Sequence, residues 1–476
     1  MSERKNGFPL FGQELQLLNL GLESFLDGPR AGGTAVVQVD WRPPLPVDPD
    51  LARVIRAEGE AIDCANRLVL ERIQAARPHL VGLSTAREVV PGMTENTFLH
   101  AGPPIIWERM CGPMRGAILG ALLYEGRADT PERAATLAAS GELQFAPCHE
   151  HAAVGPMAGV ISPSMPVFVV REETFGGTVF ATMNEGLGKV LRYGAYGPEV
   201  LTRLRWMAST LYPALRRALE ASGPIDLRSL IAQALHMGDE VHNRNRAATS
   251  LLFRALAPAL ARTAPEGSIA AEVLDFINGN DHFFLNLSMA SCKAMLDTGR
   301  DMPGSSVVVA MARNGTDFGV QLAGTGGRWY TGPAEVPDAL FFPGYTRADA
   351  NPDIGDSSIT ETNGLGGFSI AASPAIVQFV GGTPADALDY TLQMYEITAA
   401  ESNVFQIPAL GFRGSPVGID VRLVVDKNIL PFIDTGVAHR EPGIGQVGAG
   451  VLNAPAEPFV AAYEGLASHL AGTPRA

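Results

Sequence analysis

Apolar residues change their spacing along the chain, and the first change marks an N-terminal region. Short β-branched runs at 35–39 and 80–84 flank a stretch from 51 to 76 whose apolar residues recur at helical intervals. The order strand, helix, strand favours a parallel βαβ unit, with ligand groups just past the strand ends. We therefore predict a Rossmann-like α/β domain over residues 1–145.

The spacing becomes helical after a connecting α/β segment, which we place at 146–200. Asp226 is positioned to cap one helix, and Gly238 is positioned to end it. A second helix is expected to begin near Asp239. These signals predict a helical domain over residues 201–265.

The remaining sequence, 266–476, is rich in glycine and in strand patterns. Residues 305–311 read as a fully buried strand, and 419–425 alternate apolar and polar residues as a half-buried strand does. We predict an α+β domain here. The whole chain is then a multi-domain α/β protein with a Rossmann-like start, a helical middle and a glycine-rich end.

The composition excludes some classes of binding partner. The 476 residues carry a net charge of −14, which argues against nucleic acid or an anionic membrane as partner. Only 18% of residues are charged, against roughly 25% in an average soluble protein. We therefore expect exposed apolar surface, covered by partner subunits or by self-association into a homo-oligomer.

The four cysteines and the N-terminal residues bear on the cellular compartment. The cysteines lie far apart, and this spacing fits neither a disulfide framework nor a thiolate zinc site. No apolar run follows a basic start, and no run is long enough to span a membrane. We expect a cytoplasmic protein without a membrane span.

Histidines supply one candidate site. His149 and His151 are spaced i, i+2, which on an extended segment points both rings the same way, as a metal pair needs. The alternative is one histidine in the core and one at a loop surface, without a metal.

A glycine-rich stretch at 184–189 supplies a second candidate. Its two glycines precede Lys189, so its backbone N–H groups and the lysine could hold a phosphate, with Asn184 at the start of the loop. The spacing differs from a Walker A loop, and a purely structural turn is the alternative.

The join of the two predicted helices, 236–246, is the third candidate. In a helix from Asp239, one face carries His242, Asn245 and Arg246. Arg246 could fork onto a carboxylate while Asn245 bonds an amide of an anionic substrate. The alternative is a solvated helix start.

Three further segments place polar groups beside apolar ones. His282 lies in a stretch that could belong to a site or form a structural hydrogen-bond network. Arg313, Asn314 and Thr316 follow a buried strand, where they could bind a phosphate or carboxylate. Glu361, if buried, is a general acid/base candidate.

Several long motifs occur together in one order. They are VVQVDWRPP at 36–44, HAGPPIIWERMCGPMRGA at 100–117, PCHEHAAVGPMAG at 147–159, NEGLGKVLR at 184–192, MARNGT at 311–316 and NPDIGDSSITET at 351–362. Together with the 21–25 and 236–245 stretches, they resemble the AllG family, also called YlbE, from about residue 15 to about residue 455.

This resemblance implies a subunit of a multi-component oxamate carbamoyltransferase in allantoin and purine nitrogen breakdown. Such a complex converts oxalurate and phosphate, or a related N-carbamoyl acid, to oxamate and carbamoyl phosphate. The implied partners are FdrA-like (AllF) and AllH-like subunits. No cofactor is expected.

The residues can be assigned provisional roles in that reaction. Phosphorolysis needs an anion site, donors toward the carbonyl oxygen and a proton for the leaving nitrogen. We predict the anion-binding residues to be Lys189, Arg192, Arg246 and Arg313, with Asn184, Asn245, Asn314 and Thr316 as further binding groups. The predicted catalytic residues are His242, His282 and Glu361.

Two other functions remain open at this point. A metal-dependent amide or ureide hydrolase would use as ligands His149, His151, His236, Asp239 and His242. Alternatively, the chain is a non-catalytic scaffold subunit that completes a site on its FdrA-like partner.

Overall fold

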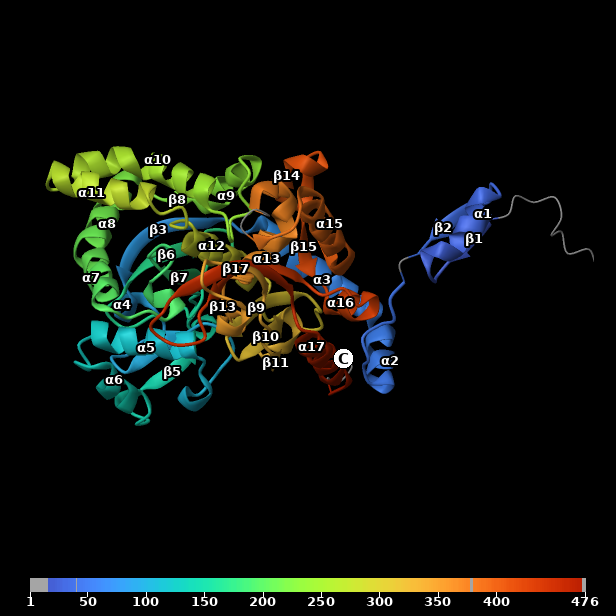
Figure 1. Ribbon diagram of the computed structural model, residues 1–476, viewed down its shortest axis with the longest axis horizontal. Helices are drawn as coiled ribbons and strands as arrows, with labels where there is room; N and C mark the ends of the chain where they lie inside the picture. The colour runs from blue at the N-terminus through green and yellow to red at the C-terminus, as the bar shows by residue number, and fades with distance from the viewer. Residues whose placement is uncertain (1–15, 40, 377–379, 473–476) are drawn as a thin grey trace, which may run out of the picture.

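The computed structural model describes residues 16–39, 41–376 and 380–472. Its N-terminal unit holds two parallel strands, β1 (Gln16–Asn19) and β2 (Ala35–Gln38), with α1 (Asp27–Ala31) between them. Figure 1 shows this unit standing apart from the body of the molecule, which the chain enters through α2 (Pro49–Ala57). The 35–39 run is therefore a strand, as predicted, but its partner is β1.

The second predicted strand, β3 (Pro78–Thr85), lies inside a different sheet. Its order is β7-β6-β3-β8, and every neighbouring pair is antiparallel. The predicted parallel βαβ pairing is wrong, because the strands before and after the helical stretch belong to separate sheets. That stretch is also two helices, α2 and α3 (Gly59–Ala75), separated at Glu58.

This half of the chain also contains several helices and a separate, two-stranded parallel sheet. Strands β6 and β7 of the antiparallel sheet contact α12. The bounds are α4 (Ala86–Val89), β4 (Thr97–His100), α5 (Gly112–Tyr124), α6 (Pro131–Ala138), β5 (Gln144–Pro147), β6 (Pro166–Glu172), β7 (Thr178–Thr182), β8 (Ile225–Asp226) and α12 (Leu285–Asp297).

The middle of the chain is helical, as predicted. It contains α7 (Pro198–Trp206), α8 (Tyr212–Ser222), α9 (Leu227–His236), α10 (Arg246–Thr263) and α11 (Gly267–Asn278). In Figure 1, α10 and α11 lie side by side along one edge of the molecule. The Asp226 cap is confirmed, because its carboxylate accepts a hydrogen bond from Ser229 N at 3.0 Å.

The predicted start of the second helix near Asp239 is wrong, since α10 begins at Arg246. Residues 237–245 instead form a loop, in which the Asp239 carboxylate accepts a hydrogen bond from Ala248 N in the first turn of α10. His242 and Asn245 therefore do not share a helix face with Arg246.

The described residues of the C-terminal part form three antiparallel sheets, in the orders β11-β10-β9-β13, β12-β17-β16 and β14-β15. The strands are β9 (Val308–Asn314), β10 (Asp317–Leu322), β11 (Tyr330–Pro333), β12 (Asp338–Phe341), β13 (Ile354–Gly355), β14 (Thr398–Ile407), β15 (Arg413–Ile419), β16 (Phe432–Ala438) and β17 (Gln446–Asn453). The helices are α13 (Ile359–Thr362), α15 (Pro384–Met394), α16 (Val421–Lys427) and α17 (Glu457–Gly472).

One of these helices contradicts the sequence prediction. The alternating residues from 419 onward form the end of β15 and then α16, because Asp420 caps a helix by accepting a hydrogen bond from Arg422 N at 2.9 Å. Val421, Val424 and Val425 are then buried on one helix face.

The mixture of helices and several small sheets confirms the broad α/β expectation. The largest apolar cluster has members from Val69 to Ala438 and draws on all four predicted segments. A second cluster joins α2, α16 and α17 to β9 and β10. No helix in the described ranges is long and apolar enough to cross a membrane.

Candidate functional site

Three side chains from distant parts of the chain meet in the interior. His242 comes from the loop after α9, Glu361 from the short helix α13 and Asp434 from strand β16. His242 Nδ1 lies 2.6 Å from Glu361 Oε1 and 3.0 Å from Asp434 Oδ1. All three side chains are almost completely excluded from solvent. The structure thus brings together two of the predicted catalytic residues, His242 and Glu361, and adds a third group.

Glu240 is a fourth member, and we call these four residues the carboxylate cluster. The Glu240 side chain is fully buried, and its Oε1 accepts a hydrogen bond from Arg244 N at 2.7 Å. Between Glu240 and His242, Val241 has a φ of +60°, which is rare for a β-branched residue. This backbone conformation therefore lies between two buried polar side chains of the cluster, those of Glu240 and His242.

The protonation of the carboxylate cluster follows from its burial and its charges. Burial alone would lower the pKa of His242, but Glu361 and Asp434 outweigh it and raise that pKa to about 10. Burial, together with Asp434 and Asp239, raises the pKa of Glu240 well above its usual value. Three carboxyl groups and one imidazole therefore share a space that water does not reach.

The backbone around Glu361 is shaped to receive its carboxylate. Glu361 Oε1 accepts a hydrogen bond from Gly367 N at 3.0 Å, and Oε2 accepts one from Thr360 Oγ1 at 2.9 Å. Gly366 has a φ of +55°, and a Cβ there would lie 2.3 Å from Glu361 Oε1. Glycine is therefore required at 366 for the turn to approach this close.

A surface groove opens beside the carboxylate cluster. Its lining contains Asn243, Arg244, Asn245, Arg246 and His282, together with Leu187, Asp281, Ala375 and Ile376. The sequence predicted Asn245, Arg246 and His282 as site residues, and the structure brings these three to one groove.

Several polar atoms of this groove wall are unpaired. Among the described residues, Asn243 Nδ2, Asn245 Oδ1 and His282 Nδ1 have no hydrogen-bond partner, although all three atoms are buried. Burial and the nearby charges of Arg192 and His242 lower the pKa of His282 to about 3, so its ring is neutral. The wall thus offers neutral hydrogen-bonding groups beside the cations of Arg244 and the exposed Arg246.

The predicted phosphate loop at 184–189 is closed by the protein itself. The Glu185 carboxylate accepts hydrogen bonds from Leu191 N at 2.7 Å and Arg192 N at 3.1 Å, the kind of donors that a phosphate would use. Arg192 in turn donates to Gly186 O, and Lys189 pairs with Glu199 at 2.6 Å. These contacts favour the structural turn over a phosphate cradle.

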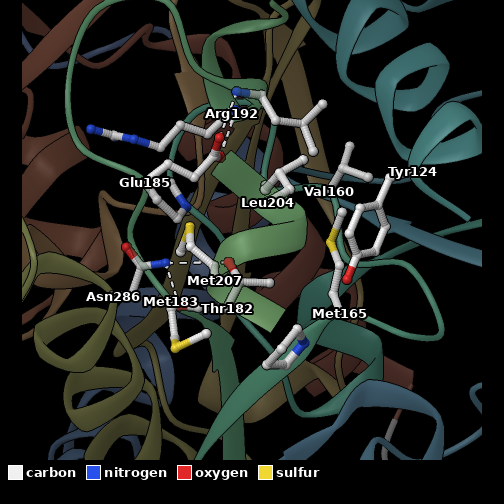
Figure 2. A pocket seen from close by; sticks show the side chains of 14 residues that line it. Tyr124, Val160, Met165, Thr182, Met183, Glu185, Arg192, Leu204, Met207 and Asn286 are labelled. Atoms are coloured by element: carbon white, nitrogen blue, oxygen red, sulfur yellow. Dashed lines mark hydrogen bonds between the residues drawn. The ribbon is translucent and has the colours of Figure 1, made fainter. Parts of the chain in front are cut away.

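A cavity lies next to this loop. Figure 2 shows Tyr124, Met165, Met183 and Met207 on its apolar walls, with Glu185, Arg192 and Asn286 on a polar side. Asn286 donates to Thr182 O at 2.7 Å and accepts a hydrogen bond from Asn184 Nδ2 at 2.8 Å. Asn184 is therefore engaged in holding the loop against α12.

The third predicted anion site, at Arg313, is occupied by protein contacts. The buried Arg313 guanidinium donates to both Asp353 carboxylate oxygens, Gly355 O, Ser357 Oγ and Thr435 Oγ1. Asn314 donates to Pro103 O and accepts hydrogen bonds from Thr316 N and Asp317 N. Thr316 donates to Arg109 O. Because these groups already have partners, we place all three outside the proposed site.

The alternative metal ligands are dispersed. The segment at Cys148–His151 is a 3-10 helix, so His149 and His151 do not point the same way as they would on a strand. His149 packs edge-on against Trp329, His151 bonds Pro91 O, and His236 packs against Phe412. Within the described ranges, one group of three His, Cys, Asp or Glu side chains has its ligand atoms within 4.8 Å of one another. It consists of His242, Glu361 and Asp434.

Asp434 and Glu240 are the members that sequence reasoning missed as site residues. Asp434 lies in an otherwise uncharged run, FIDTGVA, at 432–438. A single carboxylate within a buried strand is costly unless it has a specific role. That isolated charge was the available signal.

Relatives of known sequence match almost the whole chain. The family model for the oxamate carbamoyltransferase subunit AllG matches residues 143–357. The oxamate carbamoyltransferase subunit AllG of Escherichia coli (strain K12) is 47% identical over 409 residues, which cover 85% of this chain and 98% of that protein. The uncharacterized protein YahG of the same strain is 46% identical over 451 residues, which cover 94% of this chain and 96% of that protein.

A solved structure shares the fold. The crystal structure of a conserved protein of unknown function from Enterococcus faecalis V583 matches with a TM-score of 0.85 and 48% identity, covering 86% of this chain and 99% of that chain. With nearly half of all positions identical over most of both sequences, the resemblance predicted from the motifs is confirmed. The chain belongs to the family of the oxamate carbamoyltransferase subunit AllG.

Proposed function

We propose that this chain is a subunit of a carbamoyltransferase complex of the oxamate type and that its groove binds the carbamoyl substrate. Family membership supports the reaction class, because the Escherichia coli relative is named for it. The observation that carries the assignment of the site is the groove wall, where unpaired buried amide and imidazole atoms lie beside two arginines. The proposed partners are FdrA-like and AllH-like subunits.

The groove chemistry fits a small anionic ureide such as oxalurate. Arg246, which is largely exposed and lies 3.8 Å from Asp281, is free to turn its fork onto a substrate carboxylate. Asn243 Nδ2 would donate to a carbonyl oxygen. His282, neutral and with its Nδ1 unpaired, would accept a hydrogen bond from the ureide N–H.

The transfer itself exchanges one bond for another. An oxygen of phosphate forms a bond with the carbamoyl carbon, and the bond between that carbon and the amide nitrogen breaks. The proton that phosphate loses balances the proton that the leaving nitrogen gains, giving carbamoyl phosphate and oxamate. No covalent enzyme intermediate is required. In this arrangement the groove residues bind and orient the ureide, while His242 and Glu361 lie beneath it and are not assigned to substrate contact.

Replacing Arg246 tests the proposal. In a complex reconstituted with the FdrA-like and AllH-like subunits, Arg246→Ala should lower kcat/KM for oxalurate by about tenfold or more, since a hydrogen bond to a charged group is lost. The matched control is Arg254→Ala, which removes an exposed arginine from the same helix, α10, and should leave the rate unchanged.

The lone chain separates a binding subunit from a scaffold. Isothermal titration of the purified protein with oxalurate should give binding that Asn243→Ala weakens. If the lone chain binds no oxalurate, and if Arg246→Ala matches wild type in the complex, the groove is not the substrate site.

A further inference from the structure

We propose that the carboxylate cluster of Glu240, His242, Glu361 and Asp434 is a binding site for one divalent transition-metal ion. This inference stands on the geometry and charge of the cluster and does not depend on the carbamoyltransferase assignment. It replaces the metal ligands considered from the sequence, of which only His242 belongs to this cluster.

The donor atoms are spaced as ligands are. His242 Nδ1, Glu361 Oε1 and an Asp434 oxygen all lie within 4.8 Å of one another, with nitrogen-to-oxygen distances of 2.6 and 3.0 Å. An ion with bonds of about 2.1 Å at right angles holds adjacent ligand atoms roughly 3 Å apart. Small adjustments of the side chains would therefore bring the three atoms around one ion.

Unpaired buried oxygens supply a second, independent observation. Across the described part of the chain, Asp434 Oδ2 and Glu240 Oε2 have no hydrogen-bond partner. Asp434 Oδ1 faces His242 Nδ1 at 3.0 Å, but that nitrogen is already hydrogen-bonded to Glu361 Oε1. Asp434 and Glu240 are both fully buried. Buried polar atoms without partners are uncommon in native proteins, and an ion is one of their usual partners.

The charge balance favours a cation. Three carboxyl groups surround one imidazole, while Arg244, from the same loop as His242, is directed to Asp239 at 3.3 Å. Burying uncompensated negative charge costs several kcal/mol per ion in a protein interior. A divalent ion bound to the unprotonated His242 nitrogen would supply that compensation in place of the protons that the buried carboxyl groups otherwise retain.

Surrounding contacts hold the donors in place. Gly367 N and Thr360 Oγ1 fix the Glu361 carboxylate, Arg244 N fixes Glu240, and Asn245 Nδ2 donates to His242 O at 2.6 Å. Such contacts around metal ligands orient them and typically account for 10- to 100-fold in metal affinity. The site is thus built before any ion enters.

The donor set defines the class of ion. One imidazole nitrogen with carboxylate oxygens suits Mn²⁺, Fe²⁺, Co²⁺ or Zn²⁺, whereas Ca²⁺ and Mg²⁺ prefer oxygen alone. The described cysteines Cys64, Cys111, Cys148 and Cys292 are not members of the cluster. Mn²⁺ and Zn²⁺ are therefore the appropriate probes.

The experiment measures binding by the full chain after removal of bound metal with a chelator and dialysis. Isothermal titration with MnCl₂ and, separately, ZnCl₂ should show one ion per chain for at least one of them. That ion should also raise the thermal unfolding midpoint, because it binds the folded state. Asp434→Asn and Glu240→Gln should each weaken binding at least about tenfold.

Asp356→Asn is the matched control, because it removes an equally buried carboxylate from outside the cluster and should bind the ion as wild type does. Circular dichroism of each variant reports whether it folds. If Asp434→Asn does not fold, Glu240→Gln still tests the site. A wild-type chain that binds neither ion, or a folded cluster variant that binds as tightly as wild type, would overturn the proposal.

Discussion

Asp434 and Asp356 are both fully buried carboxylates, yet their surroundings differ. Asp356 accepts hydrogen bonds from Gly102 N at 2.8 Å and Gly155 N at 3.0 Å. Among the described residues Asp434 has no such backbone donor, and its Oδ1 faces His242 Nδ1 at 3.0 Å. A buried carboxylate with backbone donors is satisfied by its own fold. One without such donors requires another partner. At the scale of single residues, this difference separates a structural group from a candidate binding group.

The environment of Asp356 predicts a pH dependence of stability. Burial, only partly offset by the Gly102 and Gly155 hydrogen bonds, raises its pKa from 3.8 to about 7. The folded protein therefore holds this proton more tightly than the unfolded chain does. The contribution to stability is complete below pH 3.8 and is lost as the pH rises through 7, by the order of 4 kcal/mol.

Denaturant unfolding at a series of pH values measures this effect. The free energy of unfolding of Asp356→Asn should depend less on pH between 4 and 7 than that of wild type. The exposed variant Glu220→Gln should retain the wild-type slope. Equal slopes for wild type and Asp356→Asn would show that Asp356 does not titrate in this range.

Part of the candidate site could be predicted from residue types alone. His242, Glu361, Asn245, Arg246 and His282 were identified because polar residues concentrate near glycines in a charge-poor chain. Arg313 looked equally suitable, but its donors are all used by the protein. Local sequence shows that an arginine follows a strand, whereas only the tertiary fold shows that Asp353 faces it.

Helix α9 is the element in which sequence and structure agree most closely. Apolar residues at helical spacing and the capping Asp226 are local signals, and both act as expected. In α16 the same kind of cap, Asp420, overrides an alternating pattern that is typical of a strand. A short run of alternating residues is ambiguous, because Val421, Val424 and Val425 also share one helix face.

The α9 cap can be tested directly. Asp226→Ala removes the acceptor for Ser229 N and Ser229 Oγ, so it should lower the free energy of unfolding by about 1 kcal/mol. Urea denaturation followed by circular dichroism measures the change. Asp389→Ala, at an exposed position in α15, should stay within about 0.5 kcal/mol of wild type. An unchanged midpoint for Asp226→Ala would show that the cap does not stabilise the protein.

The exposed apolar surface that the charge-poor composition predicts is found on the N-terminal unit. Leu18, Leu22 and Phe25 are 63%, 68% and 67% exposed there, and Leu20 and Val37 are exposed as well. A two-stranded sheet with one helix is marginally stable in water on its own. Apolar side chains on such a unit are typical of a surface that another chain covers.

This surface leads to a prediction about assembly. The double variant Leu22→Ser, Phe25→Ser should shift the purified protein toward monomer in sedimentation velocity, because it removes apolar area from the N-terminal unit. The variant Leu68→Ser, at an exposed position on α3, is the control and should sediment as wild type does. A wild-type protein that is already a monomer at every concentration would contradict the expected self-association.

The shared core also determines when this protein can fold during its synthesis. Its largest apolar cluster extends from Val69 to Ala438, and His242 meets Glu361 across 119 residues and Asp434 still later in the chain. While the ribosome is translating the first two thirds of the sequence, the segments that complete this core have not yet been made. The nascent chain must therefore hold apolar surface exposed for most of its synthesis, the condition in which chaperones are most needed. The carboxylate cluster would be among the last parts of the molecule to form.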